Sequence, residues 1–128
     1  MGAETKAMKK TVILGATTNP TRYAYVAAEM FHERNFPFVP VGIKKGEVFG
    51  NQILDLKEKP EIKDVHTVTL YIGPDNQREW YDYILSLKPQ RIIFNPGTEN
   101  PELIRLAKEK GVEACIACNL VLLSTGQF

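Results

Sequence analysis

Short apolar runs alternate along this chain with stretches in which apolar residues recur every three or four positions. Residues 11–15 are apolar, rich in β-branched side chains and end in glycine, which is typical of a buried parallel strand that stops at a tight turn. From Tyr23 the spacing predicts a helix that ends near Asn35. The residues expected on its buried face are Tyr23, Val26, Ala27, Met30 and Phe31.

Later segments complete the predicted strands. Residues 36–41 are expected to form the second strand, since Pro37 and Pro40 fall near its ends, where proline is tolerated better than in the middle. Residues 42–64, rich in Gly, Lys and Glu, are expected to form a loop with one short helical turn at Ile53, Leu54 and Leu56. The remaining predicted strands are residues 65–72, 91–94 and 112–118.

A second helix is predicted after the third strand. Asp75 is placed to cap it, and its buried face would hold Trp80, Ile84 and Leu87. Pro89 would end it, because proline cannot continue a helix.

The last predicted helix follows the fourth strand. Asn100 supplies an N-cap, Pro101 takes the first helical position, and Gly111 is expected to end the helix. Strands that alternate with helices pair in parallel through right-handed crossovers. We therefore expect an α/β fold, a Rossmann-like open, mainly parallel five-stranded sheet with helices on both faces.

Composition indicates one globular domain. The chain has 128 residues, so we expect a single domain over residues 8–128 and a flexible tail over residues 1–7. The 16 Lys and Arg nearly cancel the 15 Asp and Glu, which argues against a nucleic-acid partner.

No apolar run approaches the roughly 20 residues that cross a bilayer, so no membrane partner is expected. Two cysteines make no disulfide framework, which favours the cytoplasm, and homo-oligomerisation is left open.

In such a sheet, ligands bind outside the carboxyl ends of the strands. The first loop at that edge, residues 15–22, reads Gly-Ala-Thr-Thr-Asn-Pro-Thr-Arg. Free amides and the positive end of the following helix favour a phosphate there, and Arg22 can clamp it. The single glycine matches neither a dinucleotide fingerprint nor a P-loop. The alternative is that Thr18, Asn19 or Thr21 only caps the helix.

The end of the second strand carries a further indication of the ligand. NAD-binding domains usually place an acidic residue there for the ribose hydroxyls, whereas this chain has Gly42-Ile43-Lys44-Lys45. Cations at this position favour a ribose that carries a phosphate, as in NADP or in the 3′-phospho-ADP part of coenzyme A (CoA). Two solvated surface lysines are the alternative.

Together the segments GATTNPTR, FVPVGIKKGEVFGNQI and IIFNPGTEN resemble the small stand-alone CoA-binding domain family, over nearly all of residues 10–123. Members are similar to the CoA-binding module of succinyl-CoA synthetase. Their Gly-Ala-Ser/Thr-x-x-Pro-x-Arg loop is matched closely by residues 15–22, and their Gln/Asn-x-Gly turn by residues 95–97. Their Pro-Val-Asn-Pro strand end is half kept at residues 40–43, and their late Asp-Arg-Cys motif survives only as Cys118.

The resemblance implies a domain that binds CoA or an acyl-CoA through its 3′-phospho-ADP portion, in a non-catalytic role. Residues 15–19 would hold the pyrophosphate, Arg22 and Lys44 would meet phosphates, and residues 72–74 would line the adenine side. Other interpretations are an NADP-linked oxidoreductase and a ligand-free interaction domain. The complete set of expected CoA-binding residues is Gly15, Ala16, Thr17, Thr18, Asn19, Arg22, Val41, Lys44, Ile72, Gly73, Pro74, Asn95 and Gly97.

Neither the cysteines nor the histidines predict metal or redox chemistry. Cys115 and Cys118 have C-x-x-C spacing, but on the expected strand they point to opposite faces. We expect structural, buried thiols, with a ligand-facing Cys118 as the alternative. His32 and His66 lack partners at ligand spacing, so no metal site is predicted.

Two further candidates are weighed and set aside. Trp80 is expected in the core rather than as a base-stacking platform, with Tyr81 and Tyr83 projecting to other sides, where they would be available for a subunit contact. Glu99 is the carboxylate best placed for acid–base work, but no nucleophile or base accompanies it. No catalytic residue is therefore predicted.

Overall fold

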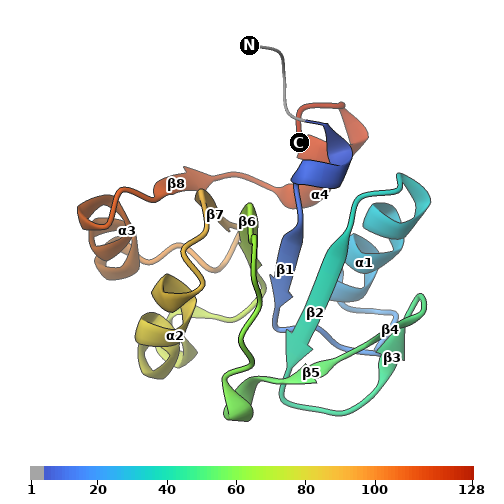
Figure 1. Cartoon of the computed structure of the whole chain (residues 1–128), viewed down its shortest axis with the longest axis horizontal. Coiled ribbons are helices and arrows are strands. Elements are labelled where there is room, and N and C mark those ends of the chain that lie inside the picture. The colour runs from blue at the N-terminus through green and yellow to red at the C-terminus, as the bar shows by residue number, and fades with distance from the viewer. Residues whose placement is uncertain (1–4) are drawn as a thin grey trace.

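The structure, a computed structural model, describes residues 5–128 and is built around one six-stranded sheet (Figure 1). The strands pair in parallel in the order β5-β2-β1-β6-β7-β8, and a separate antiparallel hairpin pairs β3 with β4. The sheet strands are β1 (Thr11–Leu14), β2 (Phe38–Gly42), β5 (Leu54–Asp55), β6 (Thr67–Leu70), β7 (Arg91–Phe94) and β8 (Glu113–Ile116), and the hairpin strands are β3 (Glu47–Val48) and β4 (Asn51–Gln52).

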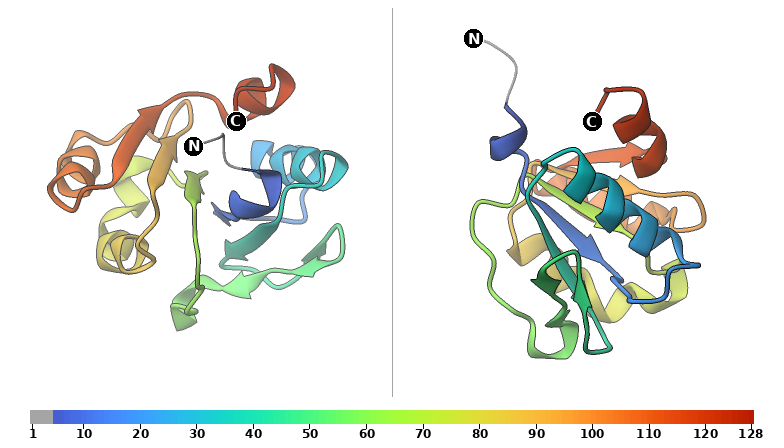
Figure 2. Two further views of the ribbon diagram at one scale, coloured as in Figure 1. Left: turned by 45° about the horizontal axis from the view of Figure 1, so that its top comes forward. Right: turned by 90° about the vertical axis from the view of Figure 1, so that its right-hand side faces the viewer.

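Helices cover both faces of this sheet (Figure 2). One face packs against α1 (Tyr23–Glu33) and α4 (Asn119–Ser124), and the other against α2 (Tyr81–Ser86) and α3 (Pro101–Glu109). Each face has its own apolar cluster, and successive β1 residues alternate between the two clusters. The expected α/β Rossmann-like architecture is confirmed. Short 3₁₀ turns are η1 (Lys6–Met8), η2 (Leu56–Glu58), η3 (Pro74–Asn76) and η4 (Arg78–Trp80).

The central position of β1 determines where a ligand can bind. It lies between β2 and β6, and residues 11–14 are fully buried. The chain winds outward from β1 in one direction through β2 and β5 and in the other through β6, β7 and β8. The strand order therefore reverses at β1, and a crevice opens outside its carboxyl end.

The sheet has one strand more than the five expected. The additional strand, β5, pairs only Leu54 and Asp55 with Val41 and Gly42 at the end of β2. Two residues are too few to form a recognisable pattern of apolar and polar positions, so the sequence does not predict this strand. It is defined only by its pairing with β2. The helical turn expected nearby is present as η2, immediately after β5.

The sequence had suggested that Pro40 lies near the end of the second strand. In the structure it lies inside β2. The carbonyls of Pro37 and Val41 accept from the amides of Thr11 and Gly15, at 3.1 and 2.9 Å, so odd-numbered residues of β2 present their backbone groups to β1. The Pro40 nitrogen faces the other edge, where β5 pairs only from Val41 onward. Proline therefore costs the ladder no hydrogen bond here.

The prediction that Asp75 caps a helix is wrong. Gly73 is the N-cap of η3, and the segment passes through η3 and η4 before α2 starts at Tyr81. Pro74 at the first position of η3 starts a turn at this point, and α2 itself has only six residues. The helix ends before Pro89, as expected.

The buried face of α1 agrees with the expected one at Ala27 and Phe31 and differs at Tyr23. Tyr23 is 73% exposed, and the fully buried positions are Ala24, Ala27, Ala28 and Phe31. The three alanines and Phe31 belong to the apolar cluster under α1, whereas Tyr23, at the first helical position, lies outside it. The predicted end is correct, because Asn35 follows the helix with a φ of 61°.

The end of the chain also corrects the expected strand over residues 112–118. The strand β8 ends at Ile116, and α4, which the sequence analysis did not anticipate, begins at Asn119 with Cys118 as its N-cap. The α3 boundaries match the prediction, since the Asn100 side chain accepts from the amides of Glu102 and Leu103. Of the predicted tail, residues 1–4 lie outside the described residues, and its last residues enter η1.

Candidate functional site

A cavity of about 1110 Å³ opens at the carboxyl edge of the sheet, beside β1. This volume is at the upper end of what small-molecule sites usually have. Five segments that are distant in sequence meet there. The lining residues are Gly15, Ala16, Thr17, Thr18, Asn19, Arg22, Tyr23, Ala24, Gly42, Ile43, Lys44, Leu56, Lys57, Tyr71, Ile72, Gly73, Asn76, Glu79, Trp80, Pro96, Gly97 and Thr98.

The loop after β1 forms the central wall. Gly15 has a φ of +102°, and a Cβ there would lie 2.9 Å from the Tyr71 carbonyl oxygen, so only glycine fits this turn. The amides of Gly15 and Ala16 donate to the Val41 carbonyl at 2.9 and 3.0 Å, which anchors the loop to β2. These two amides are therefore committed to the protein itself.

The amides that remain available lie further along the same loop. Asn19 Oδ1 accepts from the Thr21 amide and hydroxyl, at 3.0 and 2.7 Å, and so does not cap α1. Arg22 is the N-cap and makes no side-chain cap bond. In the described part of the chain, the amides of Thr17 and Thr18 and those of Tyr23 and Ala24, the first two residues of α1, have no partner. They offer the donors that seat an anion at a helix N-terminus.

The end of β2 forms the wall beside this loop. Gly42 is buried, and a Cβ on it would lie 2.4 Å from the carbonyl oxygen of Ala16. Glycine at this position therefore permits the close approach of β2 to the first loop. Beyond it, Ile43 and Lys44 are exposed and line the cavity.

A second lysine reaches the same side of the cavity from the edge strand. Lys57 lies in η2, where Asp55 Oδ1 accepts from the Lys57 amide at 2.9 Å and begins the turn directly after β5. The sequence analysis missed this residue. An Asp two positions before a lysine is the only local signal, and the pairing of β5 with β2 is what brings the turn to the cavity.

The opposite wall is more apolar. Ile72 and Gly73 line it together with Trp80, which is half-buried between the cavity and the core. The expectation for Trp80 is thus correct only for part of its surface. The expectation that Tyr81 and Tyr83 project outward is wrong, since they are 9% and 6% exposed.

Gln77 ties the two loops of this wall together. It is fully buried, and its Nε2 donates to the carbonyls of Ile72 and Thr98 at 2.8 and 2.9 Å. Its Oε1 accepts from Asn100 Nδ2 at 2.9 Å, which links the cavity wall to the N-cap of α3. A satisfied buried amide network of this kind holds the loops after β6 and β7 in place before any ligand arrives. Sequence reasoning missed Gln77, because its role requires three segments to meet.

Three of the expected binding residues do not line the cavity. Val41 is fully buried in β2, and Pro74 is exposed outside the cavity wall. Asn95 is 3% exposed and donates to Thr69 Oγ1 and the Leu70 carbonyl, both at 2.8 Å. The other ten expected residues come together along the cavity. Their role in binding stays a prediction.

The charge of the cavity is positive. Among the lining residues within residues 5–128, the cations are Arg22, Lys44 and Lys57 and the carboxylate is Glu79. All four are exposed to solvent, so their charges act on a ligand at the mouth of the cavity and not in its depth. This arrangement suits an anion with several separated charges.

The remaining candidates stand apart from this wall. Cys115 lies in β8 and Cys118 is the N-cap of α4, so the two do not share one strand. Both are half-buried and are therefore not the buried thiols that we expected.

The remaining acidic and histidine candidates have partners of their own. Glu99 Oε1 accepts from the Gly97 amide at 2.9 Å, and His66 Nδ1 lies 2.7 Å from Thr67 Oγ1. Within residues 5–128, no three His, Cys, Asp or Glu side chains are grouped to hold a metal ion.

No helix in the described part of the chain is long and apolar enough to span a membrane.

Comparison with known proteins identifies similar chains. A family model described as CoA binding domain matches residues 9–124. A solved structure, "Crystal structure of uncharacterized protein", is 58% identical with a TM-score of 0.91, and the match covers 95% of this chain and 99% of that one. A Thermus thermophilus structure, "The structure of cell-free ID.343", is 23% identical with a TM-score of 0.79, covering 94% and 90% of the two chains, and shows the same fold. Among curated proteins no match was found.

Proposed function

Because this chain belongs to the CoA binding domain family, we propose that its cavity binds CoA or an acyl-CoA by the 3′-phospho-ADP portion. The observation that carries the proposal is the pairing of open amides on the first loop with two lysines at the ends of β2 and β5. CoA has a diphosphate and a separate ribose phosphate, so it needs two anion sites a few ångströms apart. Open amides and the two lysines among the lining residues support an assignment of both sites to this cavity.

The diphosphate is assigned to the first loop. The open amides of Thr17, Thr18 and the first two residues of α1 would donate to phosphate oxygens, and the Arg22 guanidinium would add a bidentate contact. The positive end of the α1 dipole acts in the same direction.

The ribose phosphate is assigned to Lys44 and Lys57. These lysines come from neighbouring strands, because β2 and β5 pair in parallel and their carboxyl ends lie together. A carboxylate for free ribose hydroxyls is absent from the end of β2, where residues 42–45 are Gly-Ile-Lys-Lys. The adenine ring is assigned to the apolar wall formed by Leu56, Ile72 and Trp80.

A carrier, sensor or regulatory role without chemistry of its own suits this site. The one lining carboxylate, Glu79, is exposed, and Glu99 is engaged by the Gly97 amide. Neither has a nucleophile or base beside it in the described residues that would form a catalytic pair.

Isothermal titration of CoA and dephospho-CoA tests the assignment. Wild type is expected to bind CoA more tightly, and Lys44→Ala to remove most of that difference, about ten- to a hundredfold, because a charged hydrogen bond contributes about 1.5–3 kcal/mol. Lys57→Ala is expected to act in the same direction. Lys45→Ala is the matched control, since Lys45 is exposed next to Lys44 but does not line the cavity.

Two results would contradict the proposal. Equal affinity of wild type for CoA and dephospho-CoA rejects the ribose phosphate site. A change in emission on titration with NADPH, together with no binding of CoA, would favour an NADP-linked oxidoreductase instead.

A further inference from the structure

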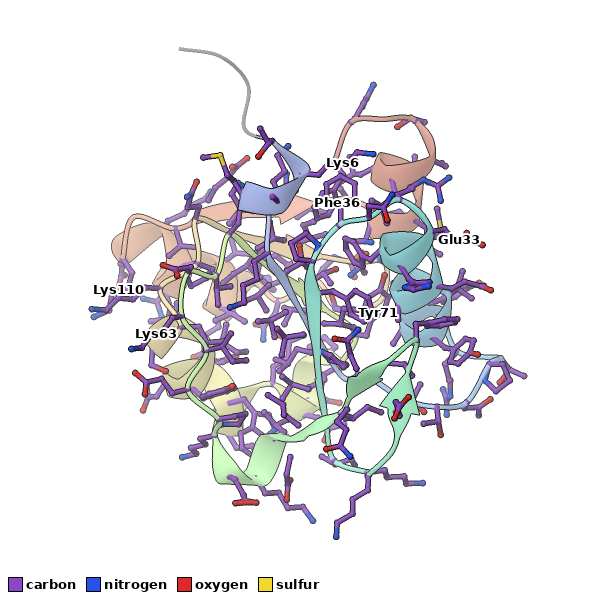
Figure 3. All side chains as sticks on the ribbon, turned by 45° about the vertical axis from the view of Figure 1, so that its right-hand side comes forward. Lys6, Glu33, Phe36, Lys63, Tyr71 and Lys110 are labelled. Carbon is purple, nitrogen blue, oxygen red and sulfur yellow. The ribbon has the colours of Figure 1, made fainter. Side chains whose placement is uncertain are left out.

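The hairpin of β3 and β4 lies in the chain between the two lysines assigned to the ribose phosphate. Lys44 comes shortly before it and Lys57 shortly after it. The Ile53 amide donates to the Gly46 carbonyl at 2.8 Å and closes the base of the hairpin. We name residues 46–53 the hairpin arm. Figure 3 shows the strands of this arm, in green, next to α1.

The position of Lys44 is determined by its two flanks. Residues 43–45 form no backbone hydrogen bond with any other residue in the described part of the chain. On one flank Gly42 packs against the first loop, and on the other a Cβ on Gly46 would collide with Thr18 Cγ2. The place of Lys44 at the cavity therefore depends on where the hairpin arm lies.

Lys57 is held independently of the arm. Its amide donates to Asp55 Oδ1 at 2.9 Å, and β5, which ends at Asp55, pairs with β2. Leu56, between these two residues, is buried in the core. A displaced arm is therefore expected to move Lys44 and to leave Lys57 in place.

An aromatic contact attaches the tip of the arm to α1. The Phe49 ring centroid lies 5.2 Å from that of Tyr25 and 5.6 Å from that of His32, and the planes of Phe49 and His32 differ by 24°. Tyr25 and His32 are about two helical turns apart and so lie on one face of α1. Val48 and Ile53 of the arm are buried in the apolar cluster under the same helix.

The residue at the tip is not the one that the turn itself favours. Phe49 and Gly50 connect β3 to β4, and both have a positive φ, of 49° and 85°. A two-residue hairpin turn with positive φ at both positions favours Asn-Gly, because a bulky side chain is strained there. Such strain persists only where other contacts outweigh it, and the contact that Phe49 contributes is its ring against α1.

The same helix carries the site assigned to the diphosphate. We name the open amides of Thr17, Thr18, Tyr23 and Ala24 the diphosphate seat. Tyr25, which contacts the arm, is the next residue of α1. In CoA the diphosphate and the ribose phosphate are joined covalently, so a lysine that meets the second phosphate must lie at a defined distance from the seat of the first.

We propose that Phe49 is a positioning residue for the ribose phosphate: its ring holds the hairpin arm on α1 and so sets the distance between Lys44 and the diphosphate seat. The inference rests on the proposed function, since it concerns the lysine assigned there. Without the ring contact, the Lys44 loop has to become ordered when the ligand binds, and the cost of that ordering lowers the affinity for the ribose phosphate alone.

Phe49→Asn tests the role of the ring without removing the turn. Asparagine suits the turn, so the hairpin still forms but loses its contact with α1. Isothermal titration is expected to show about three- to tenfold weaker binding of CoA, with the affinity for dephospho-CoA within about twofold of wild type. His32→Ala removes an exposed ring from the other side of the contact and is expected to act in the same direction.

Two variants serve as controls. Phe49→Tyr keeps the ring on α1 and is expected to bind both ligands as wild type does. Phe36→Asn is the matched control, because Phe36 is a half-buried ring after the far end of α1 that contacts Phe31 and Phe128, at 6.1 and 5.2 Å, and does not line the cavity. It is expected to leave the ratio of the two affinities unchanged.

Double substitutions show through which lysine Phe49 acts. When Lys44 is replaced by alanine, adding Phe49→Asn is expected to lower the affinity for CoA by less than about twofold. When Lys57 is replaced instead, Phe49→Asn is expected to keep its full effect, because the two residues act separately. A contact that only stabilises the fold would act equally in both backgrounds.

Three results would overturn the inference while wild type still prefers CoA to dephospho-CoA. These are an equal loss of affinity for both ligands in Phe49→Asn, no loss for CoA, and an equal effect of Phe49→Asn in the two lysine backgrounds. If wild type binds CoA and dephospho-CoA equally, the ribose phosphate site of the proposed function is itself refuted, and the inference fails with it.

Discussion

The contact between the end of β2 and the first loop is the feature of the site most sensitive to a single atom. A Cβ added by Gly42→Ala would lie 2.4 Å from the Ala16 carbonyl oxygen, whereas ordinary contacts begin near 3.4 Å. The loop and the strand must therefore separate by about 1 Å. Overpacking of this kind usually costs about 1–3 kcal/mol. For 128 residues each kcal/mol lowers the melting temperature by about 4 °C, so we expect a fall of about 4–12 °C.

The same displacement should weaken ligand binding. Ala16 belongs to the loop whose next two amides are open to a phosphate, and its own amide is held by the Val41 carbonyl. We expect CoA affinity to fall by about tenfold, because misplaced donors lose about 1.4 kcal/mol or more of a charged hydrogen bond. Differential scanning fluorimetry and isothermal titration measure the two effects.

Gly73→Ala is the matched control for this substitution. Gly73 lines the same cavity and has a φ of −63°, and an added Cβ would meet no atom within 4 Å. It should leave the melting temperature unchanged or slightly raised, since alanine restricts the unfolded chain. A melting temperature for Gly42→Ala equal to that of Gly73→Ala would refute the reasoning from the close contact.

Two further predictions concern stability. Gln77→Leu removes three hydrogen bonds and takes from the Ile72 and Thr98 carbonyls the donor they share, while Asn100 Nδ2 keeps the Tyr81 hydroxyl as a partner. The substitution should destabilise the fold by about 3 kcal/mol, measured by urea unfolding, and a loss near zero would show that water replaces the side chain. Burial raises the pKa of Tyr83 to about 12, so the folded protein holds this proton more tightly than the unfolded chain, whose tyrosines titrate near pH 10. The resulting stability is present below pH 10 and is lost as pH rises toward 12, by up to about 1.4 kcal/mol per pH unit. Tyr83→Phe should reduce that slope in urea unfolding, and an unchanged slope would contradict it.

Local sequence signals determined much of the architecture. The apolar run of β1, the Asn100 cap with its following proline, and Asn35 after α1 each act within a few residues, and each lies where it was expected. The position of the first loop likewise follows from a single glycine between a strand and a helix, although its conformation also depends on Tyr71 and Val41, which are distant in the chain.

Helix faces and boundaries were less predictable. Tyr23 has the spacing of a buried residue but is exposed, because the face of α1 that meets the sheet is formed by Ala24, Ala27 and Phe31. Asp75 has the chemistry of a cap, yet Gly73 and Pro74 start the turn earlier. Several arrangements compete at such positions, and packing against the rest of the fold selects one of them.

The sequence alone thus determined the fold class and the position of the loop after β1, because the alternation of strands and helices and the placement of Gly15 are local features of the chain. Only the tertiary structure decided that Lys57 joins Lys44 at the cavity, that Gln77 ties two loops together, and that the Asn119 amide donates to Asn95 across two strand ends. Each of these depends on segments tens of residues apart meeting at one edge of the sheet. A local pattern carries no information about the distance between such segments, which the pairing and order of the strands determine.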